Sequence, residues 1–462
     1  MLEIFIDRTL NFILFWGIWL LAPLLFDIST AVIYFFSLSV HMKDEDETPG
    51  DLSYYPYVTI VVPVHNSAGT LYKCLQSIAD QSYPSQFIQV VCVNNGSHDN
   101  SFEVFSEFQQ SRQDINLMWT SLDRPGKSIA LNTGIYSGRG SYLINVDADT
   151  WLDREAIFRV VQAFENDDSL VAATASIRVD KVLGKSTNFI DIINYCEVIE
   201  YLIAFDVGRR YQTITNTLFT LSGAFSAFRR DVILESFLYQ ERTVSEDTDL
   251  TFQIRNKDKV KEKMGRIGCI PRAVAYVEPI ESLGRLYSQR VRWQRGEVEV
   301  VAMYNKKIPG AWKAIWDFTC RILISDHTLA FSRLSWTFLI PFLYFLGYSL
   351  SMVLVAMMGL FVCYTILDGA YFLVAYKRVD RDFRNELKKI WWIVFILPFY
   401  RYLSYWFRIG GIIVGMTEEK SWKVENPVSQ LKEVLNIYKK SFQNLSQLLK
   451  DTVLKVKKVL GF

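Results

Sequence analysis

The 462-residue sequence predicts an α/β protein with a mostly parallel sheet and hydrophobic helices at both ends. Between residues 50 and 330, short apolar runs alternate with amphipathic stretches, as expected of a parallel sheet covered by helices on both faces. Long apolar stretches lie outside this region. The composition, 50% hydrophobic and 15% aromatic, is rich for a soluble protein and agrees with membrane-associated ends.

The elements of the α/β region follow from the spacing of apolar residues. Strands are short continuous apolar runs, whereas helices repeat their apolar residues every three or four positions. Within 68–80, for example, Leu71, Cys74 and Ile78 share one helical face. We expect strands at 58–62, 90–93, 115–120 and 142–146, and helices at 68–80, 101–110 and 127–137.

The long apolar stretches cover residues 9–40, 335–376 and 390–416. The first has no small-residue cleavage site, which predicts a retained anchor. The second is long enough for two crossings and ends at a basic cluster, which belongs in the cytoplasm. The third contains Arg401 and Arg408, which are costly inside a bilayer unless they face protein, water or an anionic ligand, so its placement stays open.

These features divide the chain into five segments and predict a multi-pass protein of the cell membrane whose α/β domain is cytoplasmic. The side of the membrane that holds the carboxyl-terminal tail stays open. The segments are an amino-terminal transmembrane anchor (1–42), the α/β domain (57–300), interfacial helices (301–334), a transmembrane region (335–416) and an amphipathic, lysine-rich tail (417–462).

Charge and composition exclude several classes of function. The net charge of +1 argues against a nucleic-acid partner, which would favour a basic stripe. The six cysteines are scattered without metal-binding or disulfide spacing. Because there are only four histidines, proton chemistry is expected to fall to carboxylates.

Two carboxylates, Asp147 and Asp149, follow the predicted strand 142–146 directly. The carboxyl ends of strands form the ligand crevice of an open α/β sheet, where hard oxygen ligands suit Mg²⁺ or Mn²⁺ bridging a diphosphate. Alone, the pair could equally start the following helix as a cap. Its neighbours therefore decide between the two interpretations.

Three further motifs carry polar residues. They are Thr59–Asn66 together with the loop Asn94–Asp99, the helix start Ser245–Leu250, and Gln289–Trp293 on a predicted helix. Each also has a structural interpretation. The loop could be an Asn-Gly turn, the second motif a charged helix terminus, and the third an interfacial anchor with a lipid-phosphate contact.

Together, these motifs resemble glycosyltransferase family 2, whose inverting enzymes have the GT-A fold. The resemblance spans about residues 57 to 300 and includes Gly126–Asn132 and Ser222–Arg230. It is strongest for the membrane-embedded branch of cellulose, chitin, hyaluronan and poly-N-acetylglucosamine synthases. Among subfamilies, the chain looks most like the bacterial glycosyltransferases found with exosortase-type systems in Gram-positive organisms.

The resemblance implies roles for individual residues. Asp247 would be the general base that deprotonates the acceptor hydroxyl, with the like charges of Glu246 and Asp249 beside it favouring proton uptake. Arg292 would bind the departing phosphates with a bidentate fork, and Trp293 would stack on a sugar ring. The donor-binding set is Pro63, Val64, Asn66, Asn95, Lys127, Asp147, Gln289 and Arg292; the acceptor-binding set is Ser222, Gly223, Glu246 and Trp293; the metal ligands are Asp149 and Asp147.

One departure concerns the donor nucleotide. The family usually shows Asp-Asp-Gly-Ser where this chain has Asn94-Asn95-Gly96-Ser97. An amide can still accept the uracil N3 proton and can also donate to a ring carbonyl. Uridine recognition and a plain turn therefore both stay open.

The predicted function is a metal-dependent inverting hexosyltransferase that uses a nucleotide-diphospho-sugar, UDP-linked by preference. It would elongate a polysaccharide and couple synthesis to translocation. A non-processive transferase acting on a lipid, such as a polyprenyl phosphate or glycolipid, is the alternative, and a non-catalytic membrane subunit is a more distant one. The expected partners are the donor, a saccharide or lipid acceptor and membrane lipids, with a homo-oligomer or a small accessory membrane subunit as further candidates.

Overall fold

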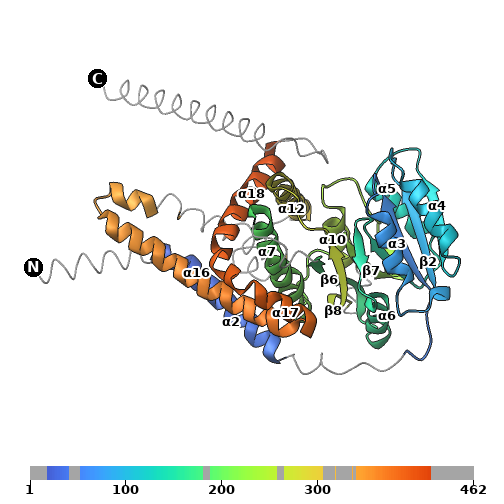
Figure 1. Cartoon of the computed structure of the whole chain (residues 1–462), viewed down its shortest axis with the longest axis horizontal. Coiled ribbons are helices and arrows are strands. Elements are labelled where there is room, and N and C mark those ends of the chain that lie inside the picture. The colour runs from blue at the N-terminus through green and yellow to red at the C-terminus, as the bar shows by residue number, and fades with distance from the viewer. Residues whose placement is uncertain are drawn as a thin grey trace, which may run out of the picture.

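An eight-stranded sheet lies at the centre of the protein, with strand order β3-β2-β1-β4-β7-β6-β8-β5 (Figure 1). The computed structural model describes residues 18–40, 52–180, 188–257, 265–304, 318, 336 and 340–417. The predicted tail beyond its first residue, 418–462, and most of the predicted interfacial segment, 301–334, lie outside these residues.

The first four strands confirm the predicted series. They are β1 (Val58–Val64), β2 (Ile88–Asn94), β3 (Asn116–Ser121) and β4 (Tyr142–Val146). All three pairings among them are parallel. Alternate residues of β1 enter cores on opposite faces of the sheet, since Ile60 belongs to one cluster and Val61 to another. Burial on both faces explains why these strands read as continuous apolar runs.

The rest of the sheet is mixed, which corrects the prediction of a mostly parallel sheet for this half of the fold. The remaining strands are β5 (Thr150–Leu152), β6 (Leu170–Val179), β7 (Phe225–Arg229) and β8 (Arg266–Val277). Strand β7 runs antiparallel to both β4 and β6, and β5 runs antiparallel to β8, whereas β6 and β8 are parallel. An apolar run reports burial but not strand direction, so periodicity could not reveal this reversal.

Helices cover both faces of the sheet. The helices α3 (Leu71–Ala79), α4 (Ser101–Ser111) and α6 (Ala156–Asn166) pack into the larger core on one face. The helices α5 (Lys127–Ser137), α9 (Arg230–Leu234) and α10 (Glu246–Asn256) pack into the core on the other. The predicted helix 68–80 begins at Leu71 because Ser67 to Thr70 form a turn whose carbonyl at Ser67 accepts from the amides of Thr70 and Leu71.

A second helical layer connects the sheet to the apolar helices. It contains α7 (Phe189–Tyr201), a π-helical turn (Leu202–Gly208), α8 (Arg209–Ile214) and α12 (Leu283–Tyr304). Helix α18 (Leu397–Thr417) packs along α12, and α17 (Arg381–Lys389) and a 3₁₀ turn (Trp391–Phe395) precede it (Figure 1). Helix α18 therefore contacts the helix that carries the Gln289–Trp293 motif.

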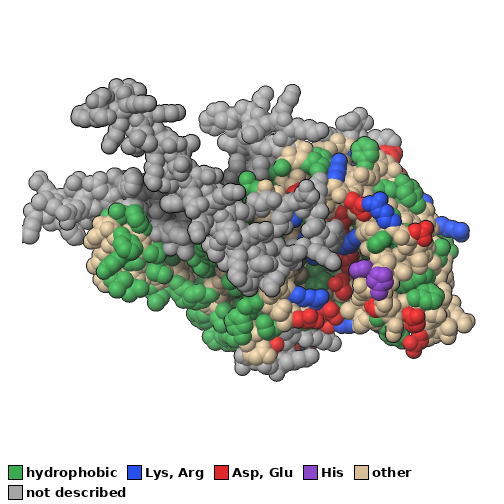
Figure 2. All heavy atoms as spheres, turned by 90° about the horizontal axis from the view of Figure 1, so that it is seen from above, with side chains coloured by type: hydrophobic (Ala, Val, Ile, Leu, Met, Phe, Trp, Pro, Cys, Tyr) green, Lys and Arg blue, Asp and Glu red, His purple; other side chains and the backbone are tan. Residues whose placement is uncertain are grey.

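Helix α16 (Leu350–Arg378) is the one helix in the described part of the chain that is long and apolar enough to cross a membrane. It lies beside α2 (Ile18–Val40), whose apolar stretch Pro23–Ser39 is shorter, and Ala31 packs against Leu367 and Tyr371 between them. The other faces of α16 expose large side chains such as Val355 and Ile366. Figure 2 shows hydrophobic side chains gathered at one end of the molecule, away from most of the charged side chains.

Candidate functional site

The parallel strands β1, β2 and β4 end at one edge of the sheet, and the polar motifs follow them there. A cavity of about 2340 Å³ opens at this edge. It brings together residues that lie far apart in the chain. Of the predicted site residues, Pro63, Asn95, Lys127, Asp147, Asp149, Ser222, Gly223, Glu246, Asp247, Gln289, Arg292 and Trp293 line it.

Two predicted donor-binding residues do not line the cavity. Val64 is fully buried, and its backbone carbonyl accepts from the Asn95 amide at 2.7 Å. Asn66 has a positive φ of 49°, and its side-chain oxygen accepts from the His98 amide at 2.8 Å. Both residues therefore act on the loop that follows β2 and shape the cavity indirectly.

The Asn94–Ser97 loop is held by its own side chains. Asn94 Oδ1 accepts from the Ser97 amide at 2.9 Å, and Gly96 has a φ of +71°, a conformation that glycine adopts without strain. Asn95 Oδ1 accepts from the backbone amide of Gly126, just before Lys127. The side-chain carbonyl of Asn95 thus positions the Gly126–Lys127 turn. This contact supports a structural role for this oxygen over a contact with the donor base.

Lys127 lies between acidic groups from two different segments. Its ammonium is 2.9 Å from Asp147 Oδ1 and 3.3 Å from Glu246 Oε1. Burial opposes the charge of Lys127, but the two carboxylates outweigh this effect and raise its pKa. Burial raises the pKa of Glu246, an effect that Lys127 partly offsets. Lys127 thus joins the β4 end to the start of α10 with a permanent positive charge.

The carboxylate of Asp149 is available at the cavity. No ion pair or side-chain hydrogen bond of Asp149 occurs among the described residues, and the side chain is exposed. Desolvation and the negative charge of Asp147 raise its pKa above the usual value. Two adjacent carboxylates fit Mg²⁺ or Mn²⁺, since such ions take one or two carboxylates together with water and substrate phosphates. The residues present therefore fit a diphosphate-bound cation.

Asp247 lies at the first turn of α10 and turns its carboxylate toward the cavity. Its Oδ2 accepts from the backbone amide of Gly223 at 3.1 Å. This contact joins α10 to the Ser222–Gly223 turn before β7, so that two predicted acceptor-binding residues and the predicted base share one wall of the cavity.

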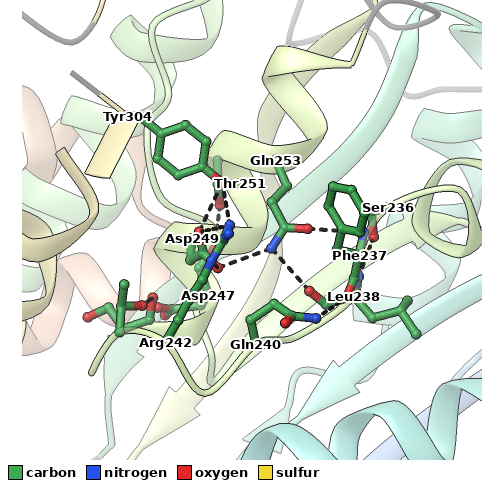
Figure 3. A network of polar contacts seen from close by, with 12 residues as sticks. Ser236, Phe237, Leu238, Gln240, Arg242, Asp247, Asp249, Thr251, Gln253 and Tyr304 are labelled. Carbon is green, nitrogen blue, oxygen red and sulfur yellow. Dashed lines mark hydrogen bonds and ion pairs between the residues drawn. The ribbon is translucent and has the colours of Figure 1, made fainter. Parts of the chain in front are cut away.

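Asp249 has a structural environment instead, which corrects its expected influence on Asp247. Its carboxylate is fully buried and accepts from Arg242 Nε at 2.9 Å and Nη2 at 2.7 Å. Tyr304 and Gln253 donate to the same carboxylate at 3.0 and 3.1 Å (Figure 3). Because Arg242 neutralises Asp249 in place, this carboxylate anchors α10 to the preceding loop and adds no free charge beside Asp247.

Helix α12 presents Gln289, Arg292 and Trp293 on the opposite wall of the cavity. The Trp293 ring meets Tyr201 and Phe205 with centroid distances of 6.2 and 5.9 Å. The guanidinium of Arg290 lies 4.5 Å from the Trp293 ring centroid. Trp293 is therefore held by aromatic and cationic neighbours while it lines the cavity.

Arg290 is the centre of a buried polar cluster that sequence reasoning missed. Its Nη2 lies 2.6 Å from Glu200 Oε2 and 3.3 Å from the Tyr400 hydroxyl, which itself donates to Glu200 at 2.7 Å. The cluster joins α7, α12 and α18. The sequence showed only an arginine within the Gln289–Trp293 motif. The partners of Arg290, Glu200 and Tyr400, are 90 and 110 positions away in the chain. His65, which also lines the cavity, was passed over within the first motif.

Comparison with known proteins agrees with this geometry. Residues 59–237 match the model of glycosyl transferase family 2. The chain is 26% identical over 301 residues to the poly-beta-1,6-N-acetyl-D-glucosamine synthase of Staphylococcus epidermidis. This alignment covers 64% of this chain and 66% of that protein. It is 25% identical over 314 residues to the enzyme of the same name from Staphylococcus aureus, covering 65% and 69%.

A solved structure supports the fold. The mannosyltransferase from Pyrobaculum calidifontis, in complex with GDP-Man and Mn²⁺, superposes with a TM-score of 0.56 and 17% sequence identity. The superposition covers 87% of this chain and all of the mannosyltransferase. The sheet thus has the fold of this mannosyltransferase, consistent with the GT-A fold, and residues 59–237 carry the similarity to glycosyl transferase family 2.

Proposed function

We propose that the chain transfers a hexose with inversion from a nucleotide-diphospho-sugar to a growing polysaccharide at the cytoplasmic face of the cell membrane. The observation that carries this proposal is the convergence of Asp147, Asp149, Asp247 and Arg292 on one cavity. The poly-N-acetylglucosamine synthases that the chain resembles favour a UDP-linked N-acetylhexosamine as the donor to test first.

The chain's own residues divide the work into donor and acceptor roles. Lys127 and Arg292 supply fixed positive charge for the leaving diphosphate, which Asp147 alone would repel. A bound Mg²⁺ or Mn²⁺ at Asp147 and Asp149 would neutralise further charge on the leaving group. At the acceptor, Asp247 would take the proton of the acceptor hydroxyl while Trp293 orients the acceptor ring.

Replacement of Asp247 by Asn tests this assignment. Asn cannot accept the proton, so we expect transfer to fall at least about 100-fold, as for the loss of a general base, while donor affinity changes little. The measurement is incorporation of labelled sugar by purified membranes from a panel of nucleotide sugars, with and without Mn²⁺, followed by sizing of the products. Asp114→Asn, on the exposed surface beside Arg112, is the matched control.

Two outcomes of this experiment would contradict the proposal. A loss of donor affinity with an unchanged rate of transfer would place Asp247 at the donor. An absence of metal-dependent transfer or donor hydrolysis with every nucleotide sugar would support a non-catalytic membrane subunit.

A second candidate keeps the chemistry and changes the acceptor to a lipid. It is favoured by the continuation of the cavity beyond Trp293 to Phe26 and Ile33 of α2 and Leu360 of α16. The apolar side chains suit hydrocarbon, whereas the tyrosines and arginines that also line this end, such as Tyr371, Tyr405 and Arg401, suit a sugar chain. Product length separates the two candidates, because a polymerase yields a ladder of sizes and a lipid transferase yields one product.

A further inference from the structure

Arg209, at the start of α8, is a buried cation on the wall of the cavity without a carboxylate partner among the described residues. Its side chain lines the cavity although the residue is only 4% exposed. Nη1 donates to Thr174 Oγ1 at 3.0 Å and approaches the Ala175 carbonyl at 3.5 Å. The adjacent Arg210, by contrast, pairs with Asp206 at 2.5 Å. Of these two neighbouring arginines, Arg210 is therefore neutralised by a carboxylate and Arg209 is not.

A buried guanidinium without a counter-ion is costly, because neutral oxygens do not compensate a desolvated charge. Burial lowers the pKa of Arg209 to about 10, so that the group stays positive at neutral pH. Within the described protein its Nε and Nη2 have no hydrogen-bond partner, and neither atom is enclosed as Nε of Arg290 is. Arg209 therefore has N–H donors left for a ligand in the cavity.

The position of Arg209 is on the acceptor side, next to Asp247. Thr174 Oγ1, which accepts from Arg209, also accepts from the backbone amide of Ser222 at 3.3 Å. The next amide, that of Gly223, donates to Asp247. Arg209, through Thr174, and Asp247 therefore lie on either side of the Ser222–Gly223 dipeptide. A ligand hydroxyl at Asp247 would place the neighbouring atoms of that ligand close to the guanidinium.

Aromatic contacts place Arg209 beside Trp293 as well. The guanidinium lies 4.5 Å from the ring centroid of Phe205, which in turn packs edge-on against Trp293. From here the cavity continues to apolar side chains of α2 and α16, including Phe26, Leu360 and Phe361. One end of this path is cationic, and the other combines these apolar side chains with tyrosines and Asp27. A cation followed by an apolar wall suits an anionic amphiphile whose hydrocarbon lies along the apolar side chains.

We propose that Arg209 binds the phosphate of a lipid acceptor or primer, with a head-group hydroxyl at Asp247 and the hydrocarbon along α2 and α16. The inference rests on the proposed glycosyl transfer and identifies the chemistry of the acceptor. A guanidinium suits this role because its fork matches phosphate oxygens and it is weakly hydrated.

Binding of short-chain lipids to the full chain in neutral detergent micelles tests the proposal. The probes are dioctanoyl phosphatidylglycerol, which has a phosphate beside hydroxyls, and dioctanoylglycerol, which lacks the phosphate. We expect the unmodified protein to prefer the phospholipid about tenfold, the effect of one charge-assisted hydrogen bond. Arg209→Gln is expected to reduce this preference to about twofold or less, and Arg209→Lys to retain part of it.

Arg285→Gln is the matched control, because Arg285 also borders the cavity but is exposed and 3.4 Å from Glu281. It should keep the tenfold preference. UDP affinity reports folding and donor binding, and it should not change in any variant. A tenfold preference that survives Arg209→Gln would overturn the proposal, as would a selective loss of UDP affinity, which would assign Arg209 to the donor phosphates.

Inorganic phosphate distinguishes the source of the anion. Competition by phosphate at the same concentrations as phosphatidylglycerol would show a site for the free anion and would contradict the lipid. The proposed function can fail separately. An Arg209-dependent lipid preference without transfer from any nucleotide sugar would support the lipid site and contradict the proposed glycosyl transfer. Normal sugar transfer without any lipid preference would support the glycosyl transfer and contradict the lipid site.

Discussion

Single residues of one motif have different roles once the chain is folded. Asp247 and Asp249 are two positions apart at the start of α10, yet Asp247 faces the cavity while Asp249 is sealed against Arg242. Helical geometry explains the difference, because positions two apart point to nearly opposite sides of a helix. The motif could therefore be recognised in the sequence, but the structural role of Asp249 required knowledge of Arg242 and Tyr304.

Glu197, in the polar cluster around Arg290, gives a prediction about pH. Its side chain is 1% exposed, its Oε1 is 3.8 Å from Arg290, and its Oε2 has no hydrogen-bond partner in the part of the chain that the structure describes. Burial, partly offset by Arg290, raises its pKa from the usual 4.5 to about 7. The folded protein then holds this proton more tightly than the unfolded chain. Its contribution to stability is therefore complete below about pH 4.5 and is lost as the pH rises toward 7.

The expected loss between pH 5 and 8 is up to about 3 kcal/mol, and Glu197→Gln should remove it. The measurement is thermal inactivation in detergent at several pH values. Glu107→Gln, on the exposed face of α4, should keep the slope of the unmodified protein. A Glu197→Gln protein that still weakens with rising pH by the same amount would show that another group is responsible.

At the scale of elements, the sequence predicted the first half of the sheet well and the second half poorly. Strand 142–146 and helix 127–137 have the bounds that their apolar patterns indicate, since both are buried in a regular βα series. Beyond Asp149 the series breaks, because β5 is only three residues long and β7 enters between β4 and β6 in reverse. Such pairings depend on tertiary contacts that no local pattern encodes.

The packing of α18 on α12 is the element contact that matters most for the site. Gly411 lies so close to α12 that a Cβ atom would be 2.7 Å from the Val291 carbonyl and 2.8 Å from Gln294 Cβ. Because backbone cannot yield as a flexible side chain can, Gly411→Ala must push the helices apart. We expect a loss of about 1–3 kcal/mol in stability and a several-fold lower rate of transfer, since α12 carries Arg292 and Trp293.

Thermal inactivation and sugar incorporation measure the two effects of Gly411→Ala. The matched control is Gly359→Ala on α16, where a Cβ atom would meet nothing within 4 Å. This variant should match the unmodified protein in both measurements. Full activity and stability of Gly411→Ala would show that α18 can shift without disturbing the site.

At the scale of the whole molecule, the carboxyl-terminal end of α16 is attached to the α/β domain. Asp380, just after α16, pairs with Arg178 of β6 at 3.1 Å, and Arg378 donates to the Leu38 carbonyl of α2 at 3.2 Å. The basic residues after α16 therefore lie beside the domain, which agrees with the prediction that both are cytoplasmic, where positive charge is in excess. The amino-terminal end of α16 points away from the domain (Figure 1).

This arrangement predicts that the two ends of α16 are on opposite sides of the membrane. Single cysteines at Leu350, 58% exposed, and at Lys389, whose side chain is 57% exposed, report the two ends in a protein whose Cys320 and Cys363 are replaced by serine. A membrane-impermeant maleimide should label Leu350→Cys in intact cells, and Lys389→Cys only after the cytoplasmic face is opened. Glu107→Cys, on the α/β domain, should behave as Lys389→Cys does. Labelling of both ends from one side would mean that α16 lies along the bilayer, and the apolar end of the cavity would then open at its surface.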